Sequence, residues 1–322
     1  MYEYDKRVVL TLDAGGTNFV FSAIQGNNEM ISPIGLPAVS DNLDECLEVL
    51  VKGFDRVIAA IPVPPVAISF AFPGPADYEN GIIGDLPNFP SFRGGVALGP
   101  SLTHKYGIPV FIENDGNLFA YGEALSGALP MINRELSLAG CSREYKNLIG
   151  ITLGTGFGAG VVINKVLLTG DNGCGGDIWL MRNKKYPDML AEESVSIRAV
   201  RRVYSDLSGQ SSASLSPKDI YDIAEGIKEG DSHAAIASFN ELGIMAGAAI
   251  ASVLNVVDGL VVIGGGVAGA SKYILPALIT ELRAQLTTFS GNKFPCVSMQ
   301  VYNGEDESER ARFLSLSDSQ VV

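Results

Sequence analysis

Histidine and cysteine are scarce in this chain, whose 322 residues include 2 histidines and 4 cysteines. No two cysteines lie close enough in sequence to form a CxxC pair or another spacing typical of a metal site. This scarcity argues against a histidine-rich zinc or iron site. Dispersed cysteines in a chain of this length also indicate reduced thiols rather than a disulfide framework. The cysteines are Cys46, Cys141, Cys174 and Cys296.

Basic residues are also few: Lys and Arg number 23 against 36 Asp and Glu, which gives a net charge of −13. A chain this acidic is a poor candidate for binding nucleic acid or an anionic membrane surface. Its most apolar stretch, residues 245–267, is interrupted by Asn255 and Asp258 and ends in glycines, so we expect no membrane span. The charged N-terminal residues show no signal-peptide pattern, and we expect a cytoplasmic protein.

Apolar residues make up 47% of the chain, enough to bury a sizeable core. At about 150 residues per domain, the length predicts two domains. Short apolar runs predict strands, which alternate with amphipathic helical segments, as is typical of an α/β fold. The predicted strands are residues 8–12, 19–24, 66–71, 110–112, 148–153, 161–163 and 259–263. The predicted helices are residues 43–60 with Asp41 as N-cap, 117–125 and 217–254, and residues 85–99 and 205–217 are predicted loops.

Two segments repeat one pattern of strand, glycine turn and strand. The first turn is Asp13-Ala14-Gly15-Gly16-Thr17, and the second begins Gly154-Thr155-Gly156. Each pattern predicts a β-hairpin, and the repetition predicts a duplicated architecture of two similar subdomains.

The glycine turns have a chemical interpretation. Glycines let backbone N–H groups approach an anion closely, a threonine hydroxyl adds a donor, and Asp13 can hold Mg²⁺ or its bound water. The alternative for each is a tight structural turn, capped in the first case by Asp13. Residues 264–266 form a third glycine run, placed to open a helix toward a nucleotide. Asp115, at a strand end, is either a cap or a general base. The chain has no GxxxxGK[ST], which excludes a P-loop NTPase.

Six longer motifs carry a family resemblance. They are DAGGTN (13–18), FPGPAD (72–77), LPNFPSF (86–92), ENDGNLFAYGE (113–123), GITLGTGFGAGVVIN (150–164) and VVIGGGVAG (261–269). The order and spacing of these motifs resemble the ROK family, which comprises bacterial sugar kinases and sugar-responsive repressors of the actin/hexokinase-like superfamily. The resemblance implies two RNase-H-like (actin-like ATPase) domains with a cleft between them. It suggests a small domain over residues 1–116 and a large domain over 117–304, with the C-terminal helix, about 305–322, as a candidate addition to the small one.

By this resemblance the chain takes ATP, Mg²⁺ and a sugar. Asp13 would organise the metal through water, and Asp115 would accept the proton of the sugar hydroxyl, the 6-hydroxyl. The family also suggests a homodimer. Repressor members carry an added DNA-binding segment before the first motif, which this sequence lacks, so we expect no nucleic-acid partner. The residues that would face the phosphates are Gly15, Gly16, Thr17, Thr155 and Gly156. Those that would border the adenosine are Gly265, Gly266 and Val267, and those that would bind the sugar are Asn88, Asn114, Asp115, Asp177 and Glu192.

The chain departs from the family pattern in one region. Many members have GEIGH followed by a cysteine-rich zinc motif, whereas residues 176–180 read GDIWL and 182–190 read RNKKYPDML. Asp177 therefore replaces a glutamate and Leu180 replaces a histidine, and we expect no structural zinc. Trp179 can stack on a sugar or belong to the core. Glu192 aligns with a sugar-binding glutamate, and the identity of the sugar stays open.

The resulting interpretation is an ATP-dependent carbohydrate kinase that phosphorylates a hexose or hexose derivative. The alternative is a non-catalytic sugar or nucleotide sensor that kept the fold and lost part of the pocket. An actin-like filament or chaperone ATPase agrees less well, because the chain carries the sugar-kinase motif LPNFPSF.

Overall fold

The computed structural model describes residues 2–15, 18–72, 74, 76–84 and 90–315. Gly16, Thr17 and Asn88 of the predicted site lie outside the described residues. The chain forms two compact units. The first comprises Met1–Leu118 and Gly170–Gly173, and the second comprises Phe119–Thr169 and Cys174–Val322.

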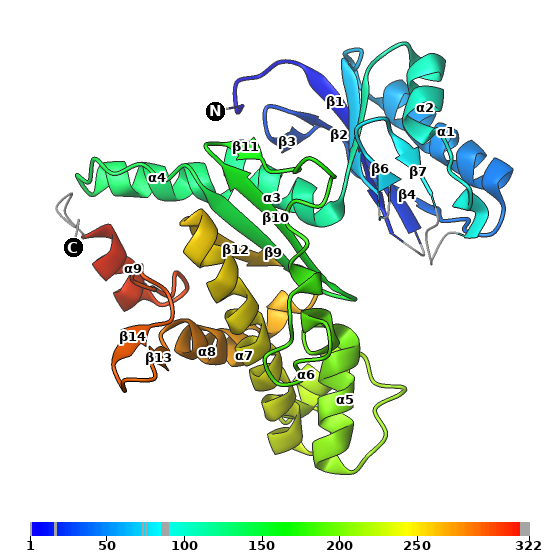
Figure 1. Cartoon of the computed structure of the whole chain (residues 1–322). Helices are drawn as coiled ribbons and strands as arrows, with labels where there is room; N and C mark the ends of the chain where they lie inside the picture. Colours follow the sequence, from blue (N-terminus) through cyan, green and yellow to red (C-terminus); the bar gives the residue numbers. More distant parts are fainter. Residues whose placement is uncertain (1, 16–17, 73, 75, 85–89, 316–322) are drawn as a thin grey trace. The chain divides into compact units, whose positions relative to one another are not determined.

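The first unit is built on a sheet with the strand order β3-β2-β1-β5-β8, in which β4 also pairs with β2 (Figure 1). β1 and β2 form the predicted antiparallel hairpin, whereas β1, β5 and β8 run parallel. Its strands are β1 Val8–Ala14, β2 Asn18–Gln25, β3 Asn28–Glu29, β4 Ile34–Pro37, β5 Ala67–Ala71 and β8 Val110–Glu113, with β6 Ala76–Asp77 and β7 Ile82–Ile83 as a separate small pair. Its helical segments are α1 Leu43–Ala60, η1 Pro90–Phe92 and α2 Leu98–Tyr106.

Helix α1 covers the sheet with one apolar face, which includes the fully buried Leu50 and Phe54. Phe54 meets the ring of Phe21 on β2 edge to face, with ring centroids 5.2 Å apart. A Cβ on Gly53 would lie 2.3 Å from that ring, so glycine lets the helix approach the strand. The predicted N-cap was wrong by one residue: the side chain of Asn42, not of Asp41, accepts the N–H of Glu45.

The second unit contains a four-stranded sheet in the order β11-β10-β9-β12, with β9 and β10 as the second predicted hairpin and β12 parallel to β9. Its strands are β9 Leu148–Leu153, β10 Phe157–Ile163, β11 Val166–Leu167 and β12 Leu260–Gly264, with a separate hairpin of β13 Gln285–Thr287 and β14 Lys293–Pro295. Its helices are α4 Ala128–Leu138, α5 Ile197–Ser208, α6 Pro217–Ala224, α7 Ser232–Val257, α8 Ser271–Leu282 and α9 Glu307–Leu314, with the short turns η2 Ile178–Leu180, η3 Ala191–Glu193 and η4 Ala268–Ala270. Helix α3, Asp115–Leu125, runs across the boundary between the units at Leu118.

Side chains alternate across this second sheet, so each face has its own apolar layer. Leu148 and Val162 pack with Ala120 of α3, whereas Ile149 and Ile151 join the core formed with α5, α7 and α8. A Cβ on Gly150 would lie 2.6 Å from Ala120, which explains a glycine in a central strand. Figure 1 shows α3 and α7 covering this sheet. The α/β class predicted from the sequence is confirmed.

Helix α7 is the core helix of this unit. Its small residues allow close packing: a Cβ on Gly243 would lie 2.4 Å from the carbonyl oxygen of Ile274 on α8. Among the described residues, α7 is the one helix long and apolar enough to cross a membrane by length and composition, and 50% of its apolar window is buried inside the structure. Burial against α5 and α8 accounts for its apolar character.

The C-terminal helix α9 belongs to the second unit. The sequence analysis considered this helix as a candidate addition to the first. Arg310 of α9 pairs with Glu135 of α4, and the ring of Phe313 lies 5.7 Å from that of Tyr145. Two predicted loops contain helix. Ser205–Ser208 continues α5 until Gly209 ends it in the left-handed conformation, and α2 begins at Leu98.

Candidate functional site

In the first unit, carboxylates gather at the carboxyl ends of parallel strands. Asp13 of β1 and Glu113 of β8 both pair in register with Ala71 of β5. Residues on one rung of a sheet point to the same face, so the two carboxylates share that face. Asp13 is exposed, and Asn114 and Asp115 follow Glu113 directly. The structure thus brings Asp13 to the same sheet edge as Asn114 and Asp115.

The turn from β8 into α3 is held by hydrogen bonds to Glu113 and Asn114. Glu113 Oε1 accepts the N–H of Asn114 at 2.8 Å and a side-chain N–H of Asn117 at 3.1 Å. Asn114 Oδ1 accepts the N–H of Gly116 at 2.9 Å. Asp115 itself accepts the same N–H at 2.9 Å and stays exposed at the first residue of α3. An exposed carboxylate on a fixed turn is able to accept a proton from a bound hydroxyl.

Tyr78 supports this turn and was missed by the sequence analysis. Its hydroxyl donates to the carbonyl oxygen of Phe72 at 3.0 Å and lies near the side chain of Asn114. Burial raises the pKa of Tyr78 to about 12, opposed by the side chain of Asn114 and assisted by the negative charges of Asp115 and Glu113. The hydroxyl therefore stays protonated as a donor. The signal was its position directly after FPGPAD.

In the second unit, two glycine turns lie at one sheet edge. The Gly154–Gly156 turn follows β9, and Gly265 follows β12, which pairs in parallel with β9. Gly265 has φ of +91°, and a Cβ there would lie 2.4 Å from the carbonyl oxygen of Leu153. The structure therefore groups predicted phosphate and adenosine residues at one edge of this sheet. They are Thr155, Gly156, Gly265, Gly266 and Val267.

The positions within this group differ in exposure. Thr155, Gly265 and Gly266 are exposed, whereas the side chain of Val267 is only 2% exposed. The N–H of Val267 donates to the carbonyl oxygen of Leu153 at 2.9 Å, which ties the two turns together. Val267 thus contributes to holding the turns rather than presenting its side chain to a ligand.

Glu192, on the short turn η3, reaches the first of these glycine turns. Its Oε2 accepts the N–H of Phe157 at 3.0 Å and would lie 2.5 Å from a Cβ on Gly156. Its Oε1 accepts a hydrogen bond from Arg198 at 2.9 Å. The N–H of Ile197 donates to the carbonyl oxygen of Gly154 at 2.9 Å. The predicted sugar ligand and the predicted phosphate turn are therefore directly connected, and Arg198 is a contributor that the sequence analysis missed.

Asp177 lies just before η2, and its neighbour Trp179 shares the segment. The indole Nε1–H of Trp179 donates to Asp177 Oδ1 at 3.1 Å, while the ring is partly buried against the core of the unit. Of the two interpretations of Trp179, the structure supports core packing. Leu180, at the position of the family histidine, is 50% exposed.

Carboxylates are the candidate metal ligands among the predicted site residues. Within the described ranges, no group of three or more His, Cys, Asp or Glu side chains is placed to hold a metal ion. Asp13 is exposed at the end of β1, and its carboxylate oxygens are the hard donors that suit a Mg²⁺ ion that keeps most of its water.

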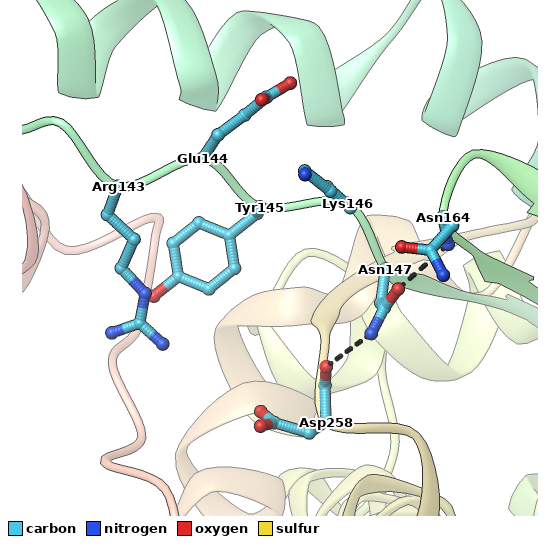
Figure 2. A pocket seen from close by; sticks show the side chains of 7 residues that line it. All are labelled: Arg143, Glu144, Tyr145, Lys146, Asn147, Asn164 and Asp258. Atoms are coloured by element: carbon cyan, nitrogen blue, oxygen red, sulfur yellow. Dashed lines mark hydrogen bonds between the residues drawn. The ribbon is translucent and has the colours of Figure 1, made fainter. Parts of the chain in front are cut away.

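A pocket of about 320 Å³ lies at the opposite, amino-terminal end of β9 and β12. Figure 2 shows its polar lining, in which Asn147 bonds to Asn164 and Asp258. None of the predicted site residues lines it. It is therefore separate from the glycine turns of the same sheet.

Comparison with known proteins agrees with these motifs. The ROK family profile matches residues 9–308. The chain is 26% identical to glucokinase of Thermotoga maritima over 290 residues, which covers 85% of this chain and 86% of that protein. It is 29% identical over 170 residues to N-acetyl-D-glucosamine kinase of Vibrio cholerae, which covers 53% and 51%. The crystal structure of glucokinase from Parabacteroides distasonis superposes with a TM-score of 0.87 at 58% identity, covering 100% of this chain and 90% of that one. The chain belongs to the ROK family.

Proposed function

We propose that this chain is an ATP-dependent sugar kinase that phosphorylates a hexose or hexose derivative at its 6-hydroxyl, with Asp115 as general base. The observation that carries the proposal is the fixed turn after β8, where Asn114 is anchored and the Asp115 carboxylate stays exposed. The names of the similar proteins, glucokinase and N-acetyl-D-glucosamine kinase, support the reaction class.

The glycine turns of the second unit fit the nucleotide. Backbone N–H groups at Thr155, Gly156 and Gly265 would donate to phosphate oxygens. In the first unit Gly15, Gly16 and Thr17 follow Asp13 and would serve the same purpose. Mg²⁺ bound through water at Asp13 would supply neutralisation of the phosphate charge.

In the proposed reaction, the sugar hydroxyl transfers its proton to Asp115 as its oxygen forms a bond to the γ-phosphorus. The bond between that phosphorus and the bridging oxygen of ATP breaks, which leaves ADP. Asn88 and Asn114 would orient the sugar from the first unit, and Asp177 and Glu192 are the sugar-binding residues proposed in the second. A pocket that pairs each hydroxyl discriminates strongly against sugars that leave a partner unpaired.

The decisive experiment is a panel of hexoses, hexosamines and N-acylated sugars with ATP, read out by ADP release. We expect sugar-stimulated ADP release with at least one of them. Asp115→Asn should lower kcat by about 100-fold to 10,000-fold, because the proton acceptor is lost, with ATP binding nearly unchanged. Asp41→Asn, an exposed carboxylate of the same unit, is the control. Wild-type turnover in Asp115→Asn would show that the base is assigned wrongly.

A second candidate is a non-catalytic sugar sensor, favoured by the altered segment at Asp177 and Leu180. Trp179 is the only tryptophan of the chain and touches Asp177, so its fluorescence reports on ligands in this segment. A fluorescence response to a sugar without ADP release from any sugar would favour the sensor.

The proposal also covers the localisation, the oligomeric state and the partners of the protein. We propose a cytoplasmic homodimer without a nucleic-acid or membrane partner, in keeping with the net charge of −13. Sedimentation velocity at micromolar concentration tests the dimer, and a single monomeric species would contradict it.

A further inference from the structure

The segment that replaces the family zinc motif is organised around one buried side chain, Asn183, which is 2% exposed. Its Nδ2 donates to the carbonyl oxygen of Leu190 at 3.1 Å and to Ser194 Oγ at 2.8 Å. Its Oδ1 accepts the N–H groups of Lys185 and Tyr186, both at 3.0 Å. These bonds use both amide hydrogens and both lone pairs, the full capacity of an asparagine side chain.

The two acceptors of the Asn183 amide flank the turn η3. Leu190 lies immediately before Ala191–Glu193 and Ser194 immediately after it. The same side chain therefore closes both ends of the turn that carries Glu192. Ser194 is also 1% exposed, so water does not compete for its bond to Asn183.

Other contacts hold this segment less firmly. Lys184 pairs with Glu281 at 2.6 Å and Lys185 pairs with Glu241 at 2.7 Å, but both lysine side chains are about half exposed. Exposed ion pairs contribute little, whereas a buried amide that loses its partners leaves polar groups unsatisfied. Backbone bonds also hold η3, including that from the N–H of Ala191 to the carbonyl oxygen of Met181 at 2.7 Å. Compared with the two lysine ion pairs, the buried amide is the stronger side-chain constraint on η3.

Through Glu192, the constraint that Asn183 places on η3 also reaches the glycine turn at residues 154–156. Glu192 Oε2 accepts the N–H of Phe157, and Glu192 Oε1 is held by Arg198. A rotation of η3 would withdraw the carboxylate from both partners. The turn at Gly154 would keep its own bond between Gly154 N–H and the Gly156 carbonyl oxygen at 3.1 Å.

We propose that Asn183 is a positioning residue that fixes the Glu192 carboxylate for sugar binding, in the place of the metal that organises this segment in other family members. The proposal rests on the proposed function, in which Glu192 binds the sugar. It requires no contact between Asn183 and any substrate.

Asn183→Ala tests the proposal, with Ser194→Ala as a milder variant that removes one acceptor. Lys184→Met is the matched control, because it breaks an exposed ion pair of the same segment and leaves Asn183 intact. We expect Asn183→Ala to raise the sugar KM by about tenfold to 100-fold with a much smaller change in the ATP KM. Ser194→Ala should change the sugar KM in the same direction by less, and Lys184→Met should match the wild type. Equal rises in both KM values, or none in a folded variant, would overturn the proposal.

Hydrogen–deuterium exchange gives a readout that needs no sugar. In Asn183→Ala, exchange should speed up at residues 190–195 and at the amide of Phe157, and it should stay at the wild-type rate in Lys184→Met. Unchanged exchange at Phe157 would mean that Asn183 does not hold Glu192.

The same variants distinguish a failure of the proposed kinase function from a failure of the proposed positioning role of Asn183. If the wild type releases no ADP with any sugar while Asn183→Ala still frees the Phe157 amide, the kinase function fails and the positioning role stands. If the wild type is an active kinase and Asn183→Ala keeps the wild-type sugar KM, the positioning role fails alone. Trp179 fluorescence, measured with the sugar that the wild type phosphorylates, gives the binding constant directly. The affinity for this sugar must be lower in Asn183→Ala.

Discussion

The two glycine hairpins share a layout but differ in how carboxylates reach them. In each unit the first strand of the hairpin, β1 or β9, also pairs with a parallel strand, β5 or β12. In the first unit Asp13 lies on the strand itself, next to its end. In the second unit the strand ends with Leu153, and the carboxylate at the turn comes from Glu192 on a separate segment.

This difference shows two ways of positioning a charged group. The position of Asp13 follows from the strand ladder, because register with Ala71 sets where the side chain points. Glu192 has no ladder beneath it and depends on side chains, namely Arg198 and Asn183. The position of Asp13, which lies on a strand, should therefore be insensitive to replacement of neighbouring side chains, so that mainly its own replacement has an effect. The position of Glu192, which lies outside the sheet, should change when its supporting residues are replaced.

The largest expected effect in this comparison is that of Asp13→Asn. The carboxylate proposed to hold the Mg²⁺ water becomes a neutral amide, so we expect kcat to fall roughly 100-fold, which corresponds to about 2.7 kcal/mol. The Mg²⁺ concentration for half-maximal activity should rise, while the sugar KM changes little. Asp77→Asn, an exposed carboxylate of the same unit, is the control. A wild-type Mg²⁺ dependence in Asp13→Asn would remove Asp13 from the metal site.

A smaller effect is expected from Gly265→Ala in the second unit. Its φ of +91° and the 2.4 Å approach of a Cβ to the Leu153 carbonyl oxygen both oppose a side chain there. The backbone strain alone should cost about 1–2 kcal/mol of stability, and displacement of the turn should raise the ATP KM. Thermal unfolding and ATP kinetics measure the two effects.

Gly269→Ala is the matched control for this prediction. Gly269 lies a few residues further along, and a Cβ there would meet nothing within 4 Å. Equal behaviour of the two variants would show that the Gly265 turn tolerates a side chain and is not fixed as the structure indicates.

Local patterns predicted the parts of the fold that depend on strands. The apolar runs on either side of a glycine turn in residues 8–24 and 148–163 predicted both hairpins. The supports of the site were not predicted, because Tyr78 and Asn183 lie in loops that have no periodicity. Arg198 lies at the start of α5, and its bond to Glu192 is not visible in the spacing of the sequence. Asn183 in particular reads as an ordinary polar loop residue, and only its burial shows that it organises the segment.

The smallest expected effect is that of Tyr78→Phe, which removes a single support of the turn carrying Asn114. Loss of this buried hydroxyl should cost about 1 kcal/mol and raise the sugar KM about fivefold. Burial raises the pKa of Tyr78 from 10.0 to about 12, so the stability that depends on its neutral form is complete below pH 10 and is lost as the pH rises toward 12. Denaturant unfolding at neutral pH and at about pH 11 should therefore show a smaller difference between wild type and Tyr78→Phe at the higher pH. Other tyrosines with raised pKa values, such as Tyr106, are present in both proteins and cancel in this difference. An equal difference at both pH values would mean that the Tyr78 hydroxyl is not buried beside Asn114.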